Sequence, residues 1–252
     1  MKHNQWTKSD LFLFFKPMPI INLVYEAPEW WGWWTPWANT LAYYRFNNNL
    51  DDSSWNGNTA SMAQWTATYY TVNWDNKAIT TSGNVVKSGV QQQDILTANH
   101  TLSFWINQTS INYLWDARVM WALWASGAIT HIWIWINGTN GLWWCVYFWQ
   151  PNKSWNYTKY TYTFSLNTWY NIILSIDNSM NCSCYVNWGQ VWTAQTIVTS
   201  WTTDFYFWNN YQLWDSSYMN WYLDDIIIEN KAWSSTEAGD YFAQFKWNYW
   251  IS

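Results

Sequence analysis

The chain has 252 residues and a formal net charge of -5, and only 11% of its residues are charged. Because nucleic-acid binding rests on basic patches, a chain with 11 basic against 16 acidic residues is not expected to bind nucleic acid. No apolar stretch reaches the roughly 20 residues of a membrane-spanning helix, so we expect one main domain, without a membrane span, covered by Asn, Ser and Thr.

Tryptophan and glycine occur in unusual proportions. The chain has 29 Trp and only 9 Gly, which is about half the usual glycine share of roughly 7%. Many tryptophans stand where a turn normally has glycine. The clearest examples are Trp55-Asn56-Gly57, Asn73-Trp74-Asp75, Asn187-Trp188-Gly189 and Trp208-Asn209-Asn210.

Asn-Gly is the strongest two-residue hairpin signal because glycine reaches positive φ without a steric penalty, and Asn-Trp lacks that property. We therefore hypothesise that most of these tryptophans are glycines in the organism, since some bacterial lineages read the opal codon as glycine. The alternative is a chain that is truly rich in tryptophan. Under either hypothesis, genuine tryptophans should face the core from strands, as we expect for Trp105 and Trp169.

Residues 1–40 differ from the rest of the chain. In residues 1–26, a basic start and the apolar run 11–15 resemble a weak signal peptide, but Lys16 and Pro17 interrupt the run. A remnant of a longer gene product explains this segment equally well. Residues 27–40 are rich in Trp, and with glycine at those positions they have the composition of a flexible linker. We predict a linker at 27–40 and a folded domain at 41–252.

From Leu41 onward, short strand-like runs alternate with polar turns. The predicted strands cover residues 41–46, 102–106, 129–136, 142–148, 160–164, 169–176, 182–186, 191–198, 204–207 and 222–228. The runs on either side of residues 137–141 read as a hairpin. Such spacing predicts an all-β sandwich of two antiparallel sheets. A short helix is expected only near the end, where Ser234 and Glu237 form a capping signature.

Four segments, in order, resemble the laminin-G-like, concanavalin A-like jelly-roll family. They are residues 44–58, 101–106, 167–188 and 221–234. Trp55 and Trp188 stand where that family has glycine, which supports the glycine hypothesis. The resemblance spans about residues 41–245 and implies a jelly-roll sandwich.

The sequence lacks the signs of a catalytic site. A retaining glycosidase needs two carboxyls about 5–5.5 Å apart, and the jelly-roll enzymes place them in a Glu-x-Asp-x-x-Glu strand. The only glutamates are Glu26, Glu29, Glu229 and Glu237, and they do not form that pattern. The neighbouring Asp224 and Asp225 should point to opposite faces of a strand, which would prevent them from acting as a pair. We predict that the chain is not an enzyme.

Calcium is the cofactor that the resemblance implies, because related jelly rolls carry a structural ion between an early loop and the last long strand. Asp51 and Asp52 lie in that loop, and Asp224 begins that strand. Carboxylates and loop carbonyls are the ligands that calcium prefers. The alternative is that Asp51 caps a turn and Asp224 pairs with a neighbour.

Three cysteines, Cys145, Cys182 and Cys184, leave at least one thiol unpaired in a monomer. Cys182 and Cys184 share one face of a predicted strand. Buried free thiols are the first expectation, and a disulfide to Cys145 is the alternative. The cysteines therefore do not identify a redox compartment.

The resemblance and the polar, weakly charged surface favour a noncatalytic recognition or adhesion module that is extracellular or on the cell surface and binds carbohydrate. Its partner would be a glycan or a surface protein, and the chain would belong to a larger polypeptide. Tyr206, Tyr211 and Tyr218, in or beside a polar loop, are candidate sugar-binding residues, although surface tyrosines with one buried edge are common. The alternative function is a structural spacer domain without a small ligand.

Overall fold

The computed structural model describes most of the predicted domain. The described residues are 38–64, 66–74, 76–80, 85–91, 99–109, 118–122, 132–136, 144–148, 162, 164–179, 181–191, 195–196, 204–209 and 221–251. The predicted N-terminal segment 1–26 and most of the predicted linker lie outside this set. The first strand begins at Thr40, one residue before the predicted domain boundary.

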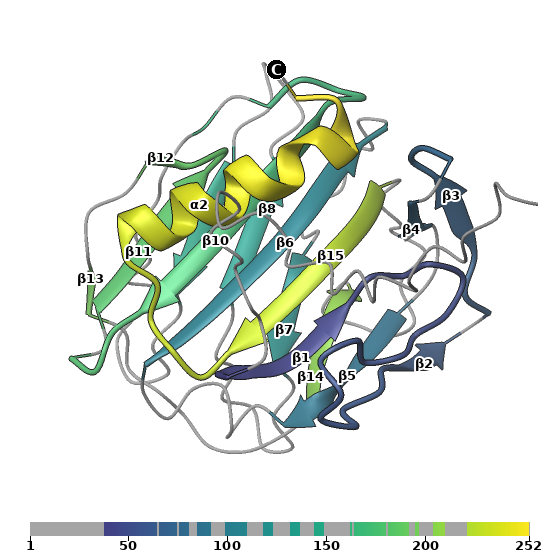
Figure 1. The fold of residues 1–252 in the computed structure, drawn as a ribbon, viewed down its shortest axis with the longest axis horizontal. Helices are drawn as coiled ribbons and strands as arrows, with labels where there is room; N and C mark the ends of the chain where they lie inside the picture. The colour runs from purple at the N-terminus through teal and green to yellow at the C-terminus, as the bar shows by residue number, and fades with distance from the viewer. Residues whose placement is uncertain are drawn as a thin grey trace, which may run out of the picture. The chain divides into compact units, whose positions relative to one another are not determined.

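Two antiparallel sheets form the body of the described chain (Figure 1). The large sheet has the order β12-β11-β10-β6-β15-β4-β3, with β1 also paired to β15 and β13 to β11. Its strands are β1 (Thr40–Tyr44), β3 (Tyr69–Thr71), β4 (Lys77–Thr80), β6 (His100–Gln108), β10 (Trp169–Ile176), β11 (Asn181–Val186), β12 (Gly189–Gln190), β13 (Gln195–Thr196) and β15 (Trp221–Glu229).

The second sheet has the order β2-β5-β14-β7, and β8 and β9 form a separate pair. These strands are β2 (Ser61–Gln64), β5 (Val85–Gln91), β7 (Arg118–Ala122), β8 (Ile132–Ile136), β9 (Trp144–Phe148) and β14 (Asp204–Asn209). The β8–β9 pair confirms the predicted hairpin. The fold is therefore an all-β antiparallel sandwich, as the strand spacing predicts.

Some boundaries differ from the predicted ones. Tyr162 and Phe164, the two described residues of the predicted strand 160–164, do not lie in a strand. Within the predicted strand 191–198, the described residues are 191, 195 and 196, of which Gln195–Thr196 form the short β13, whereas β12 (Gly189–Gln190) ends before it. Trp208 lies within β14 rather than in a turn, because pairing to β7 continues as far as Asn209.

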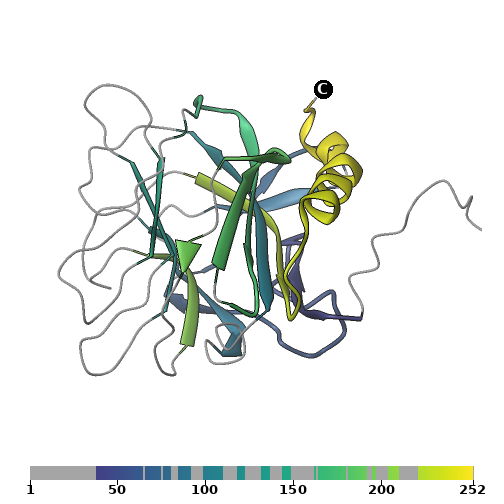
Figure 2. The ribbon, with the colours of Figure 1, turned by 90° about the vertical axis from the view of Figure 1, so that its left-hand side faces the viewer.

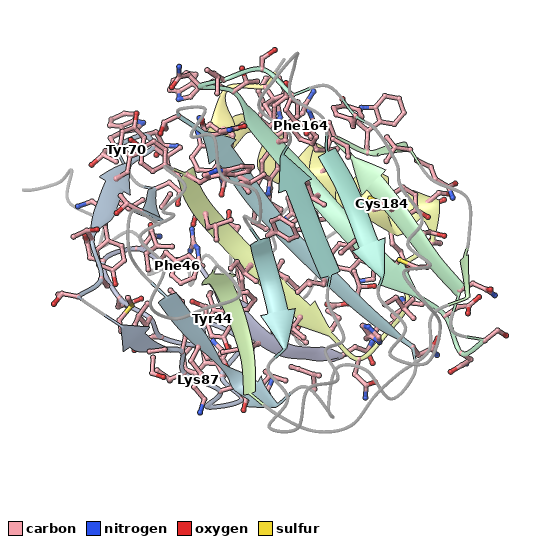
Figure 3. All side chains as sticks on the ribbon, turned by 180° about the vertical axis from the view of Figure 1, so that it is seen from behind. Tyr44, Phe46, Tyr70, Lys87, Phe164 and Cys184 are labelled. Carbon is pink, nitrogen blue, oxygen red and sulfur yellow. The ribbon has the colours of Figure 1, made fainter. Side chains whose placement is uncertain are left out.

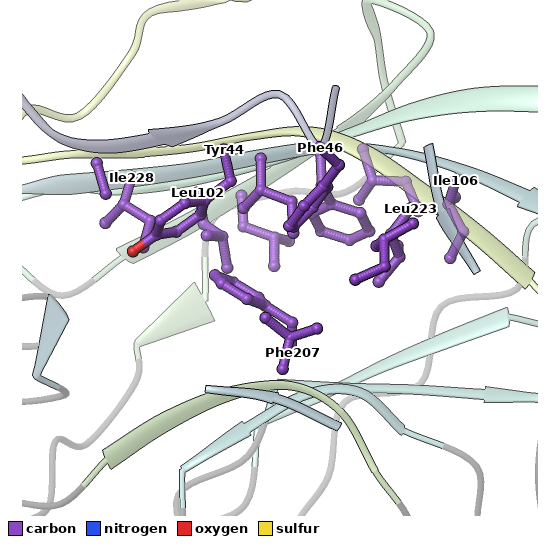
Figure 4. Packing of buried hydrophobic residues seen from close by; sticks show 14 of the residues in the cluster. Tyr44, Phe46, Leu102, Ile106, Phe207, Leu223 and Ile228 are labelled. Atoms are coloured by element: carbon purple, nitrogen blue, oxygen red, sulfur yellow. The ribbon is translucent and has the colours of Figure 1, made fainter. Parts of the chain in front are cut away.

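The side chains of each strand alternate between two different environments. On β6, Leu102, Phe104 and Ile106 point into the space between the sheets, where they pack with Phe207 of β14 in one apolar cluster (Figure 4). The alternate residues of β6 point to the outer face of the large sheet. The sandwich core is therefore built from every second residue of the strands, as a pleated backbone requires.

A C-terminal helix covers the outer face of the large sheet (Figure 2). The helix α2 (Ser235–Phe245) begins with the predicted capping box between Ser234 and Glu237, and the 3-10 helix η2 (Lys246–Tyr249) follows it. Tyr241 and Phe242 are buried against the sheet. No helix in the described part of the chain is long and apolar enough to cross a membrane.

Candidate functional site

Six aromatic rings form a continuous row along the outer face of the large sheet. In order they are Tyr70, Tyr222, Trp169, Tyr249, Trp105 and Phe242, and we call them the aromatic row. Consecutive ring centroids are 3.9, 6.4, 4.8, 4.0 and 5.7 Å apart. These separations lie near or within the range of favourable aromatic pairs.

The strand register explains how this row forms. Asn107 of β6 pairs with Tyr222 on one side and with Trp169 on the other, so these three side chains lie on one line across the outer face. Tyr249 and Phe242 reach the row from η2 and α2. The row therefore combines residues from strands and helices that are far apart in the sequence.

The row is buried at one end and exposed at the other. Trp105, Trp169, Tyr249 and Phe242 are buried beneath the C-terminal helices, whereas Tyr70 is 41% exposed. Figure 3 shows Tyr70 on β3, at the edge of the sheet. Its ring stacks on Tyr222 with an interplanar angle of 8°. This stacking holds an exposed ring in one orientation, because the ring below it is itself supported by Trp169.

Polar side chains lie on the strands and the turn that adjoin the exposed end of the row. The hydroxyls of Thr68 and Thr80 hydrogen-bond to each other beside it. Asn73, in the turn between β3 and β4, donates from Nδ2 to the carbonyl of Asn248 at 2.8 Å. A flat ring bordered by hydroxyl and amide groups is able to pack on the C–H face of a sugar while its neighbours hydrogen-bond sugar hydroxyls.

Asp224 and Asp225 form a buried pair, which corrects the prediction that they point to opposite faces. The pairing of β15 with β6 shifts between Asp224 and Ile227, and Asp225 has a φ of 42°. This β-bulge turns both carboxyls to the same side. The hydroxyl of Tyr249 lies 2.8 Å from Asp224 Oδ2 and 2.7 Å from Asp225 Oδ2.

Further side chains contact this pair, including Arg45, whose Nε lies 3.9 Å from Asp225 Oδ1. Tyr43 donates its hydroxyl to Asp225 Oδ1 at 2.7 Å, and Asn76 donates from Nδ2 to Asp224 Oδ2 at 2.8 Å. Burial raises the pKa of both carboxyls, and the charge of Asp225 raises that of Asp224 further. Both carboxyls are 0% exposed beneath the C-terminal helices. The contacts of this pair link the sheet to η2, and they leave no exposed carboxyl surface for a substrate.

Two of the three predicted calcium ligands, Asp52 and Asp224, accept hydrogen bonds from protein donors. Asp52 accepts backbone N–H groups from Tyr43, Ser54 and Asn58 at 2.8–3.0 Å. Asp51 is exposed, and Asp224 is buried in the pair described above. Within the part of the chain that the structure describes, no three His, Cys, Asp or Glu side chains gather to hold a metal ion. An ion shared by Asp52 and Asp224 would therefore have to displace these donors, and calcium stays a prediction.

The remaining predicted residues fall into two groups. Tyr206 lies on β14 at a position of which only the backbone is described, and Tyr211 and Tyr218 lie outside the described residues. Cys182 and Cys184 are buried free thiols on one face of β11, as predicted. Burial raises the pKa of Cys184 to about 12.

The sequence gives no direct sign of the exposed end of the aromatic row. Tyr70 lies in a three-residue strand that is too short to give a periodic signal, and nothing in the sequence relates it to Tyr222. The one feature of the sequence that indicates an exposed aromatic site here is the pair of tyrosines at 69 and 70, just before the polar segment 73–76.

Comparisons with known proteins place the fold but not a family. No family model matches the chain, and no curated protein matches it. Domain 4 of AbnA, a GH43 extracellular arabinanase from Geobacillus stearothermophilus solved in complex with arabinotriose, has a TM-score of 0.60 and 16% identity. That match covers 80% of this chain and 97% of the domain.

Two further solved structures are similar. The binding domain of Paraclostridial Mosquitocidal Protein 1 has a TM-score of 0.61 and 15% identity, and the match covers 82% of this chain and 52% of that one. The Trypanosoma rangeli sialidase in complex with sialic acid has a TM-score of 0.64 and 12% identity, with 86% of this chain and 34% of that one covered. The chain thus spans about half the length of the mosquitocidal binding domain and about a third of the sialidase. At these identities the likeness shows the sandwich fold alone.

Proposed function

We propose that this domain is a noncatalytic carbohydrate-recognition module of the laminin-G-like jelly-roll type, acting outside the cell as part of a larger surface polypeptide. The observation that carries the proposal is the stack of Tyr70 on Tyr222, at the exposed end of a buried aromatic row. A ring that is already held in place loses little conformational entropy when a ligand packs on it, which favours binding.

The chemistry near Tyr70 favours a neutral sugar. The hydroxyls of Thr68 and Thr80 and the amide of Asn73 belong to the same segment 68–80 that carries Tyr70, and the chain carries a net charge of -5. The similar domain of AbnA was solved with arabinotriose, which supports a glycan as the class of ligand to test first. The buried positions of Asp224 and Asp225 support a role without catalysis.

A glycan array tests which sugars the domain binds. Calorimetry then measures its affinity for arabinotriose and for any neutral oligosaccharide that it binds on the array. We expect Tyr70→Ala to abolish binding and Tyr70→Phe, which keeps the ring, to retain most of it. The matched comparison is the triple change of Tyr206, Tyr211 and Tyr218 to Ala. Loss of binding in that triple variant, with Tyr70→Ala unaffected, would move the site to the loop tyrosines.

Each measurement is made with calcium and with EDTA. Equal binding in both buffers is expected if Asp52 and Asp224 keep the donors described above, whereas loss in EDTA supports the predicted ion. If the domain binds no glycan in either buffer, the spacer function would be favoured instead.

A further inference from the structure

Three exposed tryptophans have a left-handed backbone. Trp55, Trp188 and Trp250 have φ values of 70°, 66° and 59°, and their side chains are 88%, 64% and 77% exposed. We infer that these are glycine positions: the protein made by its organism carries glycine at 55, 188 and 250, and tryptophan at the buried positions 105, 169 and 233. This inference is independent of the proposed function.

The other residues with positive φ show why the tryptophans are exceptional. Nine described residues other than glycine have positive φ: Phe46, Asn48, Trp55, Asn99, Asn167, Asn187, Trp188, Asp225 and Trp250. Asn and Asp tolerate this region because their short polar side chains hydrogen-bond locally. Phe46 is buried, so core packing holds it. A bulky exposed side chain has no such compensation.

Trp188 occupies a turn that specifically requires glycine. Val186 and Gly189 pair across the β11–β12 hairpin, so Asn187 and Trp188 are the two central turn residues. Both have positive φ, at 47° and 66°. This is the geometry of a type I′ turn, whose preferred sequence is Asn-Gly. Asn187 is the first residue of that pair, and Trp188 stands in place of the second.

Trp250 occupies a second kind of glycine position. It is the left-handed C-cap of η2, and its backbone N–H points to the carbonyls of Lys246 and Trp247. Glycine is the usual residue where a helix ends in this conformation, because a Cβ is strained there. Trp55 likewise follows the Asp52–Ser54 turn, just before Asn56 and Gly57, and Gly57 itself has a φ of 78°.

The buried tryptophans have the opposite environment. Trp105 stacks on Tyr249 with ring centroids 4.0 Å apart, and Trp169 packs beside the same tyrosine. Trp233 donates from Nε1 to the buried Glu229. Glycine at these positions would leave a large cavity, and at position 233 it would also remove the indole donor to Glu229, which would keep only the hydroxyl of Thr40 as a side-chain donor. One residue type therefore occupies two incompatible kinds of site, as expected when two codons are read as one amino acid.

The first test combines peptide mass spectrometry of the protein isolated from its organism with sequencing of its gene, which gives the codons. We expect glycine masses and opal codons at 55, 188 and 250, and tryptophan masses and UGG at 105, 169 and 233. Tryptophan masses at all six positions would overturn the inference.

A second test measures the thermal unfolding of the chain that carries tryptophan at all 29 positions. Trp55, Trp188 and Trp250 are each changed to Gly and, separately, to Ala. Both changes remove the exposed indole, but only Gly relieves the backbone, so each Gly variant should melt about 2–4 °C above its Ala counterpart. The control is Trp105→Gly, which should lower Tm sharply. Gly variants that melt at or below their Ala counterparts at all three positions would contradict the inference.

Discussion

The two faces of the large sheet are formed by alternate residues of the same strands, and they differ in composition and in what covers them. On the inner face, Leu102, Phe104 and Ile106 of β6 are buried in an apolar cluster. On the outer face, the alternating residues Ser103 and Trp105 lie among hydroxyls, carboxyls and aromatic rings beneath α2 and η2.

The difference between the faces separates stability from recognition. The inner face is closed by a second sheet and makes the ordinary hydrophobic contribution to folding. The outer face is closed by helices over only part of its width, so its aromatic row continues into solvent at Tyr70. We therefore expect changes on the inner face to affect stability most, and changes at the exposed end of the row to affect binding.

The largest effect is expected for Phe104→Ala on the inner face. Loss of a fully buried ring creates a cavity and should lower the free energy of unfolding by about 3–5 kcal/mol. Urea unfolding followed by tryptophan fluorescence measures this loss. A change below about 1 kcal/mol would mean that the two sheets are not tightly packed at Phe104.

A smaller loss is expected for Tyr249→Phe on the outer face. The ring stays in the aromatic row, but Asp224 and Asp225 lose their shared hydroxyl. Leaving buried acceptors without this donor should cost about 1–3 kcal/mol. Hydrogen exchange should also become faster in α2 and η2, while β6 keeps its protection. Equal acceleration in β6 would show that the two faces do not respond separately.

The pH dependence of stability is a third test of the outer face. Burial holds the pKa of Asp224 above its unfolded value of about 3.9, so the folded state favours the protonated carboxyl. This contribution is fully present below about pH 4 and is lost as the pH rises through the folded pKa. Asp224→Asn should therefore gain stability relative to the unchanged chain as the pH rises from about 4 toward the folded pKa of Asp224, by up to about 1.4 kcal/mol per pH unit.

Asp177 provides a control of opposite sign for the pH test. The backbone N–H of Asn181 lowers the pKa of Asp177, so its contribution is present above the unfolded pKa and is lost as the pH falls. The free energy of unfolding is measured against pH for the Asp224→Asn variant and for the unchanged chain. If the two curves stay parallel above about pH 4, the prediction for Asp224 is contradicted.

The smallest effect on stability is expected for Tyr70→Ala. Because Tyr70 is 41% exposed and its ring stacks on Tyr222, its loss should cost about 0.5–1 kcal/mol. Differential scanning calorimetry should show a nearly unchanged melting transition. A loss as large as that of Phe104→Ala would make Tyr70 a structural residue rather than a binding platform.

Local patterns in the sequence predicted several elements closely. The predicted strand 169–176 matches β10, and the Ser234–Glu237 capping signature begins α2 where expected. Trp105 and Trp169 are buried, as genuine core tryptophans should be. Each of these features depends on alternation or capping within a few residues, which a sequence records directly.

Features that depend on distant partners were not predictable in the same way. The β-bulge at Asp225 overturned the expectation of opposite faces, because one extra residue in a strand reverses the alternation that follows it. The Tyr70–Tyr222 stack joins residues that are 152 positions apart along the chain, as 222 minus 70 gives. Its existence depends on β4 lying between β3 and β15.

The sequence by itself determined the all-β class, the helix cap and the five longest strands of the large sheet, and it indicated glycine at the turn positions 55 and 188, because these follow from backbone stereochemistry and local side-chain periodicity. Only the tertiary structure decided that Asp224 and Asp225 share one tyrosine, and that one end of an aromatic row reaches solvent. These depend on sheet order and on where the C-terminal helices stop, which are set by packing between segments far apart in the chain.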